Sequence, residues 1–477
     1  MSEMPWVDAS GIAEAVAEGR TSASDVVEST LAWIQTKNPE INAFTEVTEA
    51  RARAEAAALD AAIARGMKPG PLAGVPFAVK NLFDVAGLPT LAGSRINQDR
   101  APATRDAVLI ERMRAAGAIL VGAVGMGEYA YDFTGENAHE GDVRNPHDLA
   151  RMSGGSSSGS AAATAAWMAP LSLGSDTNGS LRVPASLCGV FSLKPTYGRL
   201  PRTGTFSFVD SLDHLGPFAR SAADLALAYD ALQGWDAGDH ACAKRKADPA
   251  YPTLDQTPEA LRIGLPGGWF ADSCTEAALA AAERVAKGLA ADGQISRPNL
   301  DEAEAGRAAA YLITNSEGAA FHLERLRTRA ADFDPDTRDR FLAGAVLPAA
   351  WVSRAQRVRA WWLKSALAAF RSVDALIVPA TPVSAPLRGQ KHLDLAGRRV
   401  PLRPSLGLLA QPFSCIGLPV VTVPVFEPGE MPIGVQIVLP PWQEARALAL
   451  AQKLGREGVA VAHPPSNLVE TDAHAVA

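Results

Sequence analysis

The chain has 477 residues, of which 47% are hydrophobic and 20% are charged, so it can bury a large core and is not expected to be disordered. Its net charge of −7 and the lack of a Lys- and Arg-rich block argue against nucleic acid as the main partner. No apolar run is long enough to span a membrane and no leader is visible, so a membrane role is not expected.

The cysteines and histidines suggest no metal chemistry. The four cysteines are far apart and form no CxxC pair, so neither a zinc site nor a disulfide framework is predicted. The eight histidines are scattered through the chain, and none stands in a pattern that announces a role. We therefore expect no metal or other cofactor, and a reducing cytoplasm is the simplest location.

Helices and short strands alternate in the first half of the chain. The segment before residue 65 is predicted to be helical, because its Ala-, Glu- and Arg-rich part has helical spacing. A short apolar strand that ends in Lys80 follows it. This alternation continues and predicts βα units in a parallel or mixed sheet. The expected ranges are helices over 8–65, a strand over 74–80, a helix over 106–117 and a strand over 118–122.

The second half is predicted to be mainly helical until strands return near the C-terminus, over 375–379, 420–424 and 433–439, before a helix over 444–458. No internal repeat and no long linker interrupts the chain. We therefore predict one large α/β domain. Its parts are an N-terminal helical flank (8–65), a core (70–220), a helical region (235–370) and closing strands and helix (371–460), all within residues 1–465, before a loose tail (466–477).

The densest cluster of small residues runs from Gly154 to Ser160 and resumes at 173–180. Such density predicts a close approach of backbone segments. The first segment lacks the Gly-Lys-Ser/Thr ending of a phosphate-binding loop, and no GxSxG pattern surrounds Ser156 or Ser180. Serine chemistry can also use a lysine as its base, provided that burial lowers the lysine pKa. Lys80, at the end of an apolar run, meets that requirement, although a structural role is equally compatible with its position.

These residues resemble the signature of the amidase-signature family. The resemblance rests on Gly-Gly-Ser-Ser at 154–157, on Gly-Ser-Asp-Thr-Asn-Gly-Ser-Leu-Arg at 174–182 and on Ser-Leu-Asp-His-Leu-Gly-Pro at 211–217. It extends over about residues 8–460. It implies a fold with a large mixed β-sheet core covered by helices on both faces.

The resemblance also implies residue roles. Lys80 would be the general base, Ser156 would relay the proton from a cis peptide bond, and Ser180 would attack the substrate carbonyl. The backbone N–H groups of Thr177, Asn178, Gly179 and Ser180 would form the oxyanion hole. In two places the sequence departs from most relatives, which have glycine at the positions of Ser158 and Asn178. Asparagine tolerates a positive φ better than most residues, so the hole is expected to survive.

Five further residues have a predicted role around this centre. Ser153 is expected to hydrogen-bond Lys80 or the relay serine. Asp176 and Arg182 are interpreted as a supporting charged pair rather than as substrate contacts. Arg340 resembles the position that binds a substrate carboxylate in transamidating members of the family, although a solvated helix charge is equally compatible. Tyr131 either lines the pocket or packs in the core.

Within the family, the chain resembles the branch that hydrolyses 1-carboxybiuret. The residues that carry this likeness include Gly-Gly-Trp-Phe at 267–270 and Thr-Asn-Ser-Glu-Gly at 314–318. It implies a small ureido or amide substrate with a carboxylate, released ammonia, and a small helical partner subunit in a hetero-oligomer. Two alternatives remain open: a glutaminase subunit of the glutamyl-tRNA amidotransferase A type, and an inactive scaffold with the same fold.

Overall fold

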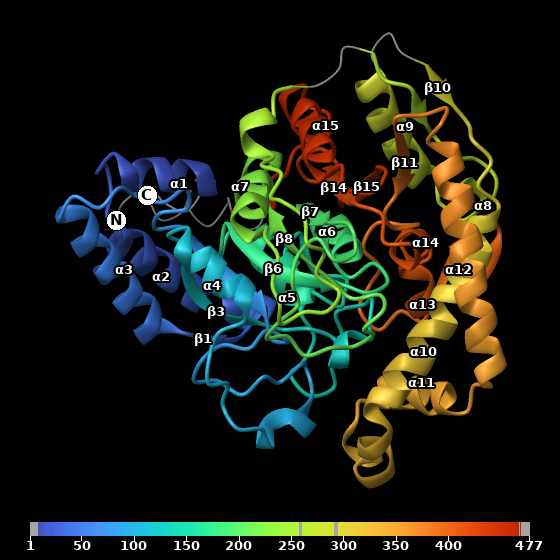
Figure 1. Cartoon of the computed structure of the whole chain (residues 1–477), viewed down its shortest axis with the longest axis horizontal. Coiled ribbons are helices and arrows are strands. Elements are labelled where there is room, and N and C mark those ends of the chain that lie inside the picture. Colours follow the sequence, from blue (N-terminus) through green and yellow to red (C-terminus); the bar gives the residue numbers. More distant parts are fainter. Residues whose placement is uncertain (1–7, 257–259, 291–293, 467, 469–477) are drawn as a thin grey trace.

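An eleven-stranded mixed sheet runs through the molecule (Figure 1). The computed structural model describes residues 8–256, 260–290, 294–466 and 468. Two small hairpins accompany the sheet: β4 (Arg144–Asn145) with β5 (Asp148–Met152), and β12 (His392–Leu395) with β13 (Arg398–Pro401). The strands of the large sheet, in spatial order, are β1 (Phe44–Val47), β3 (Ile119–Val124), β2 (Pro76–Lys80), β6 (Leu171–Asp176), β8 (His214–Ala219), β7 (Phe191–Lys194), β14 (Val420–Val425), β15 (Ile433–Val438), β11 (Ala375–Pro379), β9 (Ile263–Gly264) and β10 (Ile295–Ser296).

Strand direction changes along this sheet. The neighbours β3, β2 and β6 are parallel, as are β11, β9 and β10. The strands between these two groups pair antiparallel, and so does β1 with β3. The predicted mixed sheet is therefore confirmed.

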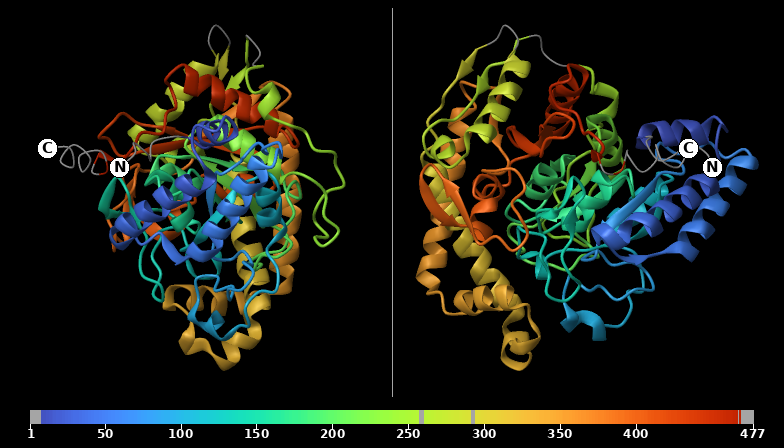
Figure 2. Two further views of the ribbon diagram at one scale, coloured as in Figure 1. Left: turned by 90° about the vertical axis from the view of Figure 1, so that its left-hand side faces the viewer. Right: turned by 180° about the vertical axis from the view of Figure 1, so that it is seen from behind.

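Helices cover both faces of the sheet, as the resemblance implied. The helices are α1 (Ala9–Ala17), α2 (Ala23–Ile41), α3 (Glu49–Ala64), α4 (Val108–Ala115), α5 (Ser158–Ala165), α6 (Arg182–Cys188), α7 (Ala222–Leu232), α8 (Trp269–Asp272), α9 (Glu276–Ala290), α10 (Glu302–Thr328), α11 (Pro335–Ala345), α12 (Ala349–Ala369), α13 (Leu402–Leu406), α14 (Gln411–Cys415) and α15 (Glu444–Arg456). The helices α1–α3 lie at one end of the molecule and α10–α12 at the opposite end (Figures 1 and 2).

The alternation of side chains in β2 explains why Lys80 faces the glycine- and serine-rich segment. Phe77 and Val79 pack in the same core as residues of α4 and α7. Ala78 packs on the other face, with the alanines of α5. Side chains two residues apart in a strand share a face, so Lys80 follows Ala78 toward the start of α5.

The main differences from the predicted elements are strands, because β6, β7 and β8 were not among the predicted strands. The N-terminal flank contains β1 between two helices, and the predicted helical region contains the two-residue strands β9 and β10. The division into one domain over residues 1–465 stays a prediction. The predicted loose tail lies outside the described residues except for 466 and Leu468, and Leu468 is buried.

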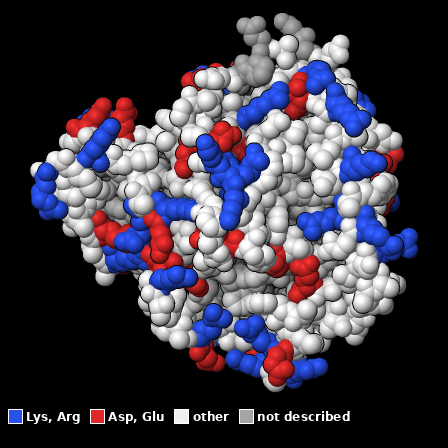
Figure 3. All heavy atoms as spheres, in the orientation of Figure 1, with Lys and Arg blue, Asp and Glu red and all other residues white. Residues whose placement is uncertain are grey.

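Two further findings concern the surface. None of the helices in the described ranges is both long and apolar enough to cross a membrane. On the face drawn in Figure 3, acidic and basic side chains are interspersed over most of the surface. Along the right-hand edge, where Figure 1 places α12, most of the charged side chains are basic.

Candidate active site

Lys80 is completely buried at the end of β2 and makes hydrogen bonds to three serines. Its Nζ lies 2.7 Å from Ser156 Oγ, 2.9 Å from Ser175 Oγ and 3.1 Å from Ser157 Oγ. Burial lowers the pKa of Lys80 from its ordinary value to about 7, an effect opposed by the nearby carboxylates, of which Asp213 contributes most. A substantial part of the amine is therefore neutral near neutral pH and can accept a proton.

The three serines come from two segments that meet beside Lys80. Ser156 and Ser157 directly precede α5, and Ser175 lies near the end of the neighbouring strand β6. The peptide bond between Gly155 and Ser156 is cis. The Ser157 hydroxyl also bonds to the backbone of Ser175, which ties the two segments together. These contacts hold the serine hydroxyls around one amine.

Ser153 and Ser158 do not take part in this cluster in the way that the sequence suggested. The Ser153 hydroxyl donates to the Val143 carbonyl oxygen at 2.8 Å rather than bonding to Lys80. Ser158 lies in the first turn of α5, and its hydroxyl donates to the Gly125 carbonyl oxygen. The predicted contact from Ser153 to Lys80 or to Ser156 is not seen, because the Ser153 hydroxyl donates to backbone carbonyl oxygens instead.

The turn that carries Ser180 follows β6 directly. The left-handed conformation in this turn falls on Gly179, with φ +136°, and not on Asn178. A Cβ at Gly179 would approach Ala410 Cβ to 2.8 Å, so glycine is required there for space as well as for conformation. Asn178 therefore does not need to tolerate a positive φ.

The Asp176–Arg182 pair is buried, and Asp176 supports this turn by accepting hydrogen bonds from its backbone. The Arg182 guanidinium contacts both carboxylate oxygens at 3.0 Å and also donates to Gln436 and to the Ala410 carbonyl oxygen. Burial alone would raise the pKa of Asp176, but Arg182 holds it well below its ordinary value. Both charges are satisfied inside the protein, which agrees with their interpretation as support.

One member of the expected oxyanion hole is already engaged by this pair. The Gly179 N–H donates to Asp176 Oδ1 at 2.8 Å, so it is not available to a substrate oxygen. Thr177, Asn178 and Ser180 line the pocket and stay the predicted donors. The Thr177 hydroxyl donates to Asp213 Oδ1 at 2.6 Å, which anchors the turn to the segment at 208–213.

A small pocket of about 120 Å³ opens beside Ser180. Its wall combines the turn just described with residues of α10, α11, α13 and α14, with the segment 130–133 and with Phe208. The lining residues are Ala130, Tyr131, Asp132, Phe133, Thr177, Asn178, Ser180, Phe208, Tyr311, Thr314, Arg340, Arg403, Pro404 and Gln411. The structure thus brings Tyr131 and Arg340 to the same pocket as Ser180.

Tyr131 and Arg340 form one unit on the pocket wall. The guanidinium lies 3.9 Å from the centre of the tyrosine ring and donates to the Tyr131 carbonyl oxygen. Its Nε donates to the Asp336 carbonyl oxygen at 2.8 Å. Among the described residues, no carboxylate pairs with Arg340. Its positive charge therefore remains unbalanced next to the pocket.

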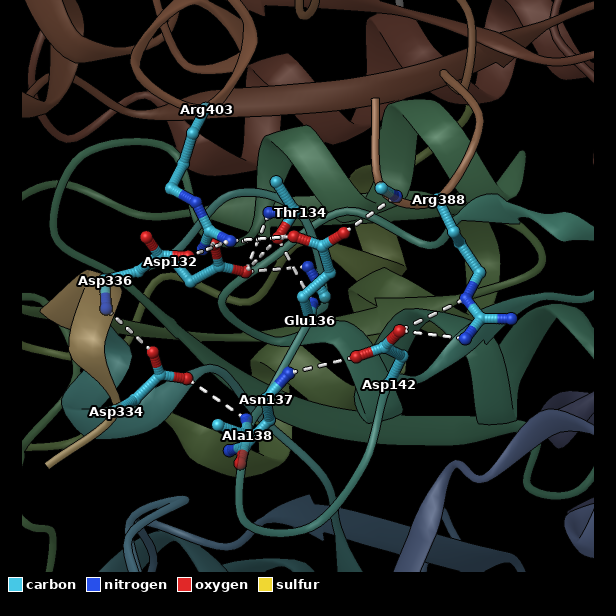
Figure 4. Close-up of polar contacts among 12 residues, drawn as sticks. Asp132, Thr134, Glu136, Asn137, Ala138, Asp142, Asp334, Asp336, Arg388 and Arg403 are labelled. Atoms are coloured by element: carbon cyan, nitrogen blue, oxygen red, sulfur yellow. Dashed lines mark hydrogen bonds and ion pairs between the residues drawn. The ribbon is translucent and has the colours of Figure 1, made fainter. Parts of the chain in front are cut away.

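Arg403, the other arginine of the pocket, is surrounded by carboxylates (Figure 4). It contacts Asp132, and it lies 2.7 Å from Glu136 and 2.9 Å from Asp336. A neighbouring pair, Arg388 with Asp142, fixes the same loop at 2.8 Å. Arg403 thus joins loop 132–142 to the start of α11, and its charge is balanced within the protein.

The comparisons with known proteins agree with this geometry. Residues 25–448 match the family profile described as Amidase. The chain belongs to the amidase signature family. It is therefore an amidase-family hydrolase, as the resemblance in its sequence implied.

Relatives of this amidase match along nearly its whole length. The 1-carboxybiuret hydrolase subunit AtzE from Pseudomonas sp. (strain ADP) is 53% identical to this chain. The match covers 94% of this chain and 98% of the AtzE chain. The A subunit of the glutamyl-tRNA(Gln) amidotransferase from Anaeromyxobacter sp. (strain K) is 36% identical, over 94% and 96% respectively. A solved structure described as "An unexpected vestigial protein complex reveals the evolutionary origins of an s-triazine catabolic enzyme" is 52% identical, with a TM-score of 0.93 and coverage of 96% and 100%.

Sequence reasoning missed several residues of the amidase site. Ser157 and Ser175 contact Lys80, Asp213 anchors Thr177, and Thr314 contacts Asn178. All four lie inside or next to quoted motifs, so their positions were visible although their partners were not. Within the described residues, no group of three or more His, Cys, Asp or Glu side chains is arranged to hold a metal ion.

Proposed function

We propose that this amidase hydrolyses the terminal C–N bond of a small ureido or amide substrate that carries a carboxylate, such as 1-carboxybiuret, and releases ammonia. The observation that carries the proposal is the 2.7 Å contact between Ser156 and the buried Lys80, whose pKa is lowered to about 7. It supplies a base at neutral pH beside the pocket that Ser180 lines.

The proposed mechanism uses only groups of this chain and water. Neutral Lys80 accepts the proton of Ser156, which takes the proton of Ser180 as Ser180 Oγ attacks the carbonyl carbon. The N–H groups of Thr177, Asn178 and Ser180 stabilise the negative oxygen of the tetrahedral intermediate. The C–N bond then breaks, and the nitrogen leaves as ammonia with a proton returned through Ser156. Water attacks the acyl-enzyme along the same proton path and restores Ser180.

The unbalanced charge of Arg340 supports a substrate with a carboxylate. A guanidinium can bind a carboxylate through two parallel hydrogen bonds, and only part of the donor set of Arg340 is used inside the protein. The small pocket favours a short molecule over a long acyl chain. The relative at 53% identity is named for 1-carboxybiuret, which is such a molecule.

An ammonia-release assay tests the proposed activity. Wild-type protein and Ser180→Ala should be compared on carboxybiuret, biuret, allophanate, glutamine and simple amides. We expect wild type to prefer carboxybiuret and Ser180→Ala to release no ammonia. A clear preference for glutamine would favour the alternative of an amidotransferase glutaminase subunit. No turnover of any substrate, with and without the proposed partner, would favour the inactive scaffold.

The proposal includes a small helical partner subunit in a cytoplasmic hetero-oligomer. The free state of all four cysteines supports that location. The exposed side of α12 supports a docking site, because Trp361 and Leu367 are 49% and 38% exposed there. The helix carries Arg354, Arg357, Arg359 and Lys364 and no acidic residue. An acidic helix with an apolar stripe would complement this surface.

Co-expression with a candidate small helical partner protein tests this part of the proposal. We expect a stable complex by size-exclusion chromatography with light scattering. The double variant Arg357→Glu/Lys364→Glu should weaken the complex about tenfold or more, whereas the exposed control Lys68→Glu should not. A double variant that binds normally would remove α12 from the interface, and a fully active monomer would remove the partner.

A further inference from the structure

The Asn178 side chain has a buried oxygen without a hydrogen-bond partner among the described residues. Asn178 lies two positions before Ser180 and is 6% exposed on the pocket wall. Buried polar atoms are normally paired, and an unpaired one destabilises the folded protein. A pocket-lining residue with such an atom is therefore a candidate contact for a substrate.

Thr314 on α10 fixes which half of the amide is engaged. Asn178 Nδ2 donates to Thr314 Oγ1 at 2.8 Å, and Thr314 is 1% exposed. The donor end of the amide is thereby committed to α10, and the acceptor end, Oδ1, is left free. The motif at 314–318 thus has a contact with the turn that carries Ser180, across 136 positions of sequence.

Other acceptors on the pocket wall are already engaged. The Asp132 carboxylate binds Arg403 and the N–H groups of Thr134 and Gly135. The Gln411 amide oxygen accepts from Arg307 at 2.9 Å. These groups have no need of a substrate donor. The Asn178 oxygen, in contrast, gains its missing partner if a bound molecule presents a hydrogen-bond donor such as an N–H group.

A ureido substrate presents such a group where a carboxamide does not. In a biuret, an N–H flanks the carbonyl that Ser180 would attack, whereas in glutamine a CH₂ group occupies that place. We propose that Asn178 Oδ1 accepts a hydrogen bond from this flanking N–H and makes the amidase selective for ureido over carboxamide substrates. The inference rests on the proposed function and adds the residue that sets its substrate class.

Thr314 is then a positioning residue. Its hydroxyl accepts from Asn178 Nδ2 and so orients the Asn178 amide with its oxygen, and not its nitrogen, toward the substrate. A misoriented amide would place an N–H donor against the substrate N–H, which is unfavourable. Removal of the Thr314 hydroxyl should therefore weaken the ureido preference without removing the acceptor itself.

The test compares a substrate pair that differs only in the flanking group. One member is a carboxylate-bearing biuret, and the other has CH₂ in place of the N–H next to the scissile carbonyl. For each substrate, kcat/KM of a variant is divided by that of wild type, which cancels the difference in intrinsic reactivity. We expect Asn178→Ala to lower this ratio about tenfold more for the ureido member than for the CH₂ member. Thr314→Val should act in the same direction, whereas Thr314→Ser, which keeps the hydroxyl, should behave like wild type.

Equal losses on both substrates would overturn the inference, because they would indicate a general effect on the turn. A binding measurement distinguishes this outcome from a failure of the proposed function. In the Ser180→Ala background, calorimetry should show that Asn178→Ala weakens the ureido ligand about tenfold and the CH₂ ligand little. Turnover of neither substrate by wild type would sink the proposed function, whereas unchanged binding selectivity in Asn178→Ala would sink the inference.

Discussion

The two walls of the pocket are built in different ways. The reacting wall comprises Lys80 and the segment from Ser153 to Arg182, and every described residue from 168 to 196 is buried. The recognising wall comprises Tyr131 and the inner faces of α10 and α11, where Tyr311 is 42% exposed. Substitutions in the reacting wall disturb a closely packed, buried segment. Substitutions in the recognising wall can fall next to partly exposed side chains such as Tyr311.

The largest expected effect is the loss of activity when a reacting side chain of the reacting wall is removed. Ser180→Ala should abolish turnover, and Ser156→Ala and Lys80→Met should each lower kcat roughly 1000-fold or more, because the three groups act as one unit. Ser153→Ala is the matched control, since its buried hydroxyl bonds to Val143 and not to Lys80. Ammonia release and circular dichroism would measure activity and folding. Near-normal turnover by Lys80→Met at pH 7 would rule out lysine as the base.

A second test separates the two arginines that line the pocket. Arg340→Ala should raise KM for an anionic substrate by roughly 10- to 150-fold, the equivalent of ~1.5–3 kcal/mol, and change KM for a neutral amide little. Arg403→Gln is the control, because its charge is balanced by Asp132, Glu136 and Asp336. It should lower the melting temperature without such selectivity. Equal effects of Arg340→Ala on both substrates would remove Arg340 from recognition.

The smallest expected effect is a shift in the pH dependence of kcat/KM, which reports the protonation of Lys80. Lys80 must be neutral to act as a base, and burial lowers its pKa to about 7, so kcat/KM should fall about tenfold per pH unit below that value. The negative charge of Asp213 raises the pKa of Lys80, so Asp213→Asn should move this limb to lower pH. The exposed neighbour Asp210→Asn should leave it in place. Profiles from about pH 5 to pH 9 would decide, and a limb that stays fixed in Asp213→Asn would refute the coupling.

Much of the reacting wall was predictable, because its residues stand in continuous motifs. An apolar strand that ends in Lys80 and a run of glycines and serines indicate burial and close approach by themselves. The engagement of the Gly179 N–H by Asp176 was not predictable, since a motif names neighbours and not hydrogen bonds. The strand β1 was missed because four residues between two helices give too short an alternation to detect.

The recognising wall could be predicted only in part. Arg340 was suggested by a resemblance, whereas Tyr131 was equally compatible with the pocket wall and with the core. The roles of both residues stay predictions. The contacts of Thr314 with Asn178 and of Asp213 with Thr177 join residues 136 and 36 positions apart. Such contacts depend on how the helices dock on the sheet, and no periodicity in the sequence encodes the pairing of two particular side chains.

The carboxylate beneath the Ser180 turn has a consequence for acid exposure. Because Arg182 depresses the pKa of Asp176 in the folded protein, the stability that this group contributes is present above the ordinary carboxyl pKa and fades only as pH falls toward the depressed value. Below about pH 7 the ammonium of Lys80 predominates in the folded chain as well as in the unfolded one, so further acidification adds little cost there. Mildly acidic solution should consequently abolish activity while the protein stays folded. Activity should return at neutral pH without refolding.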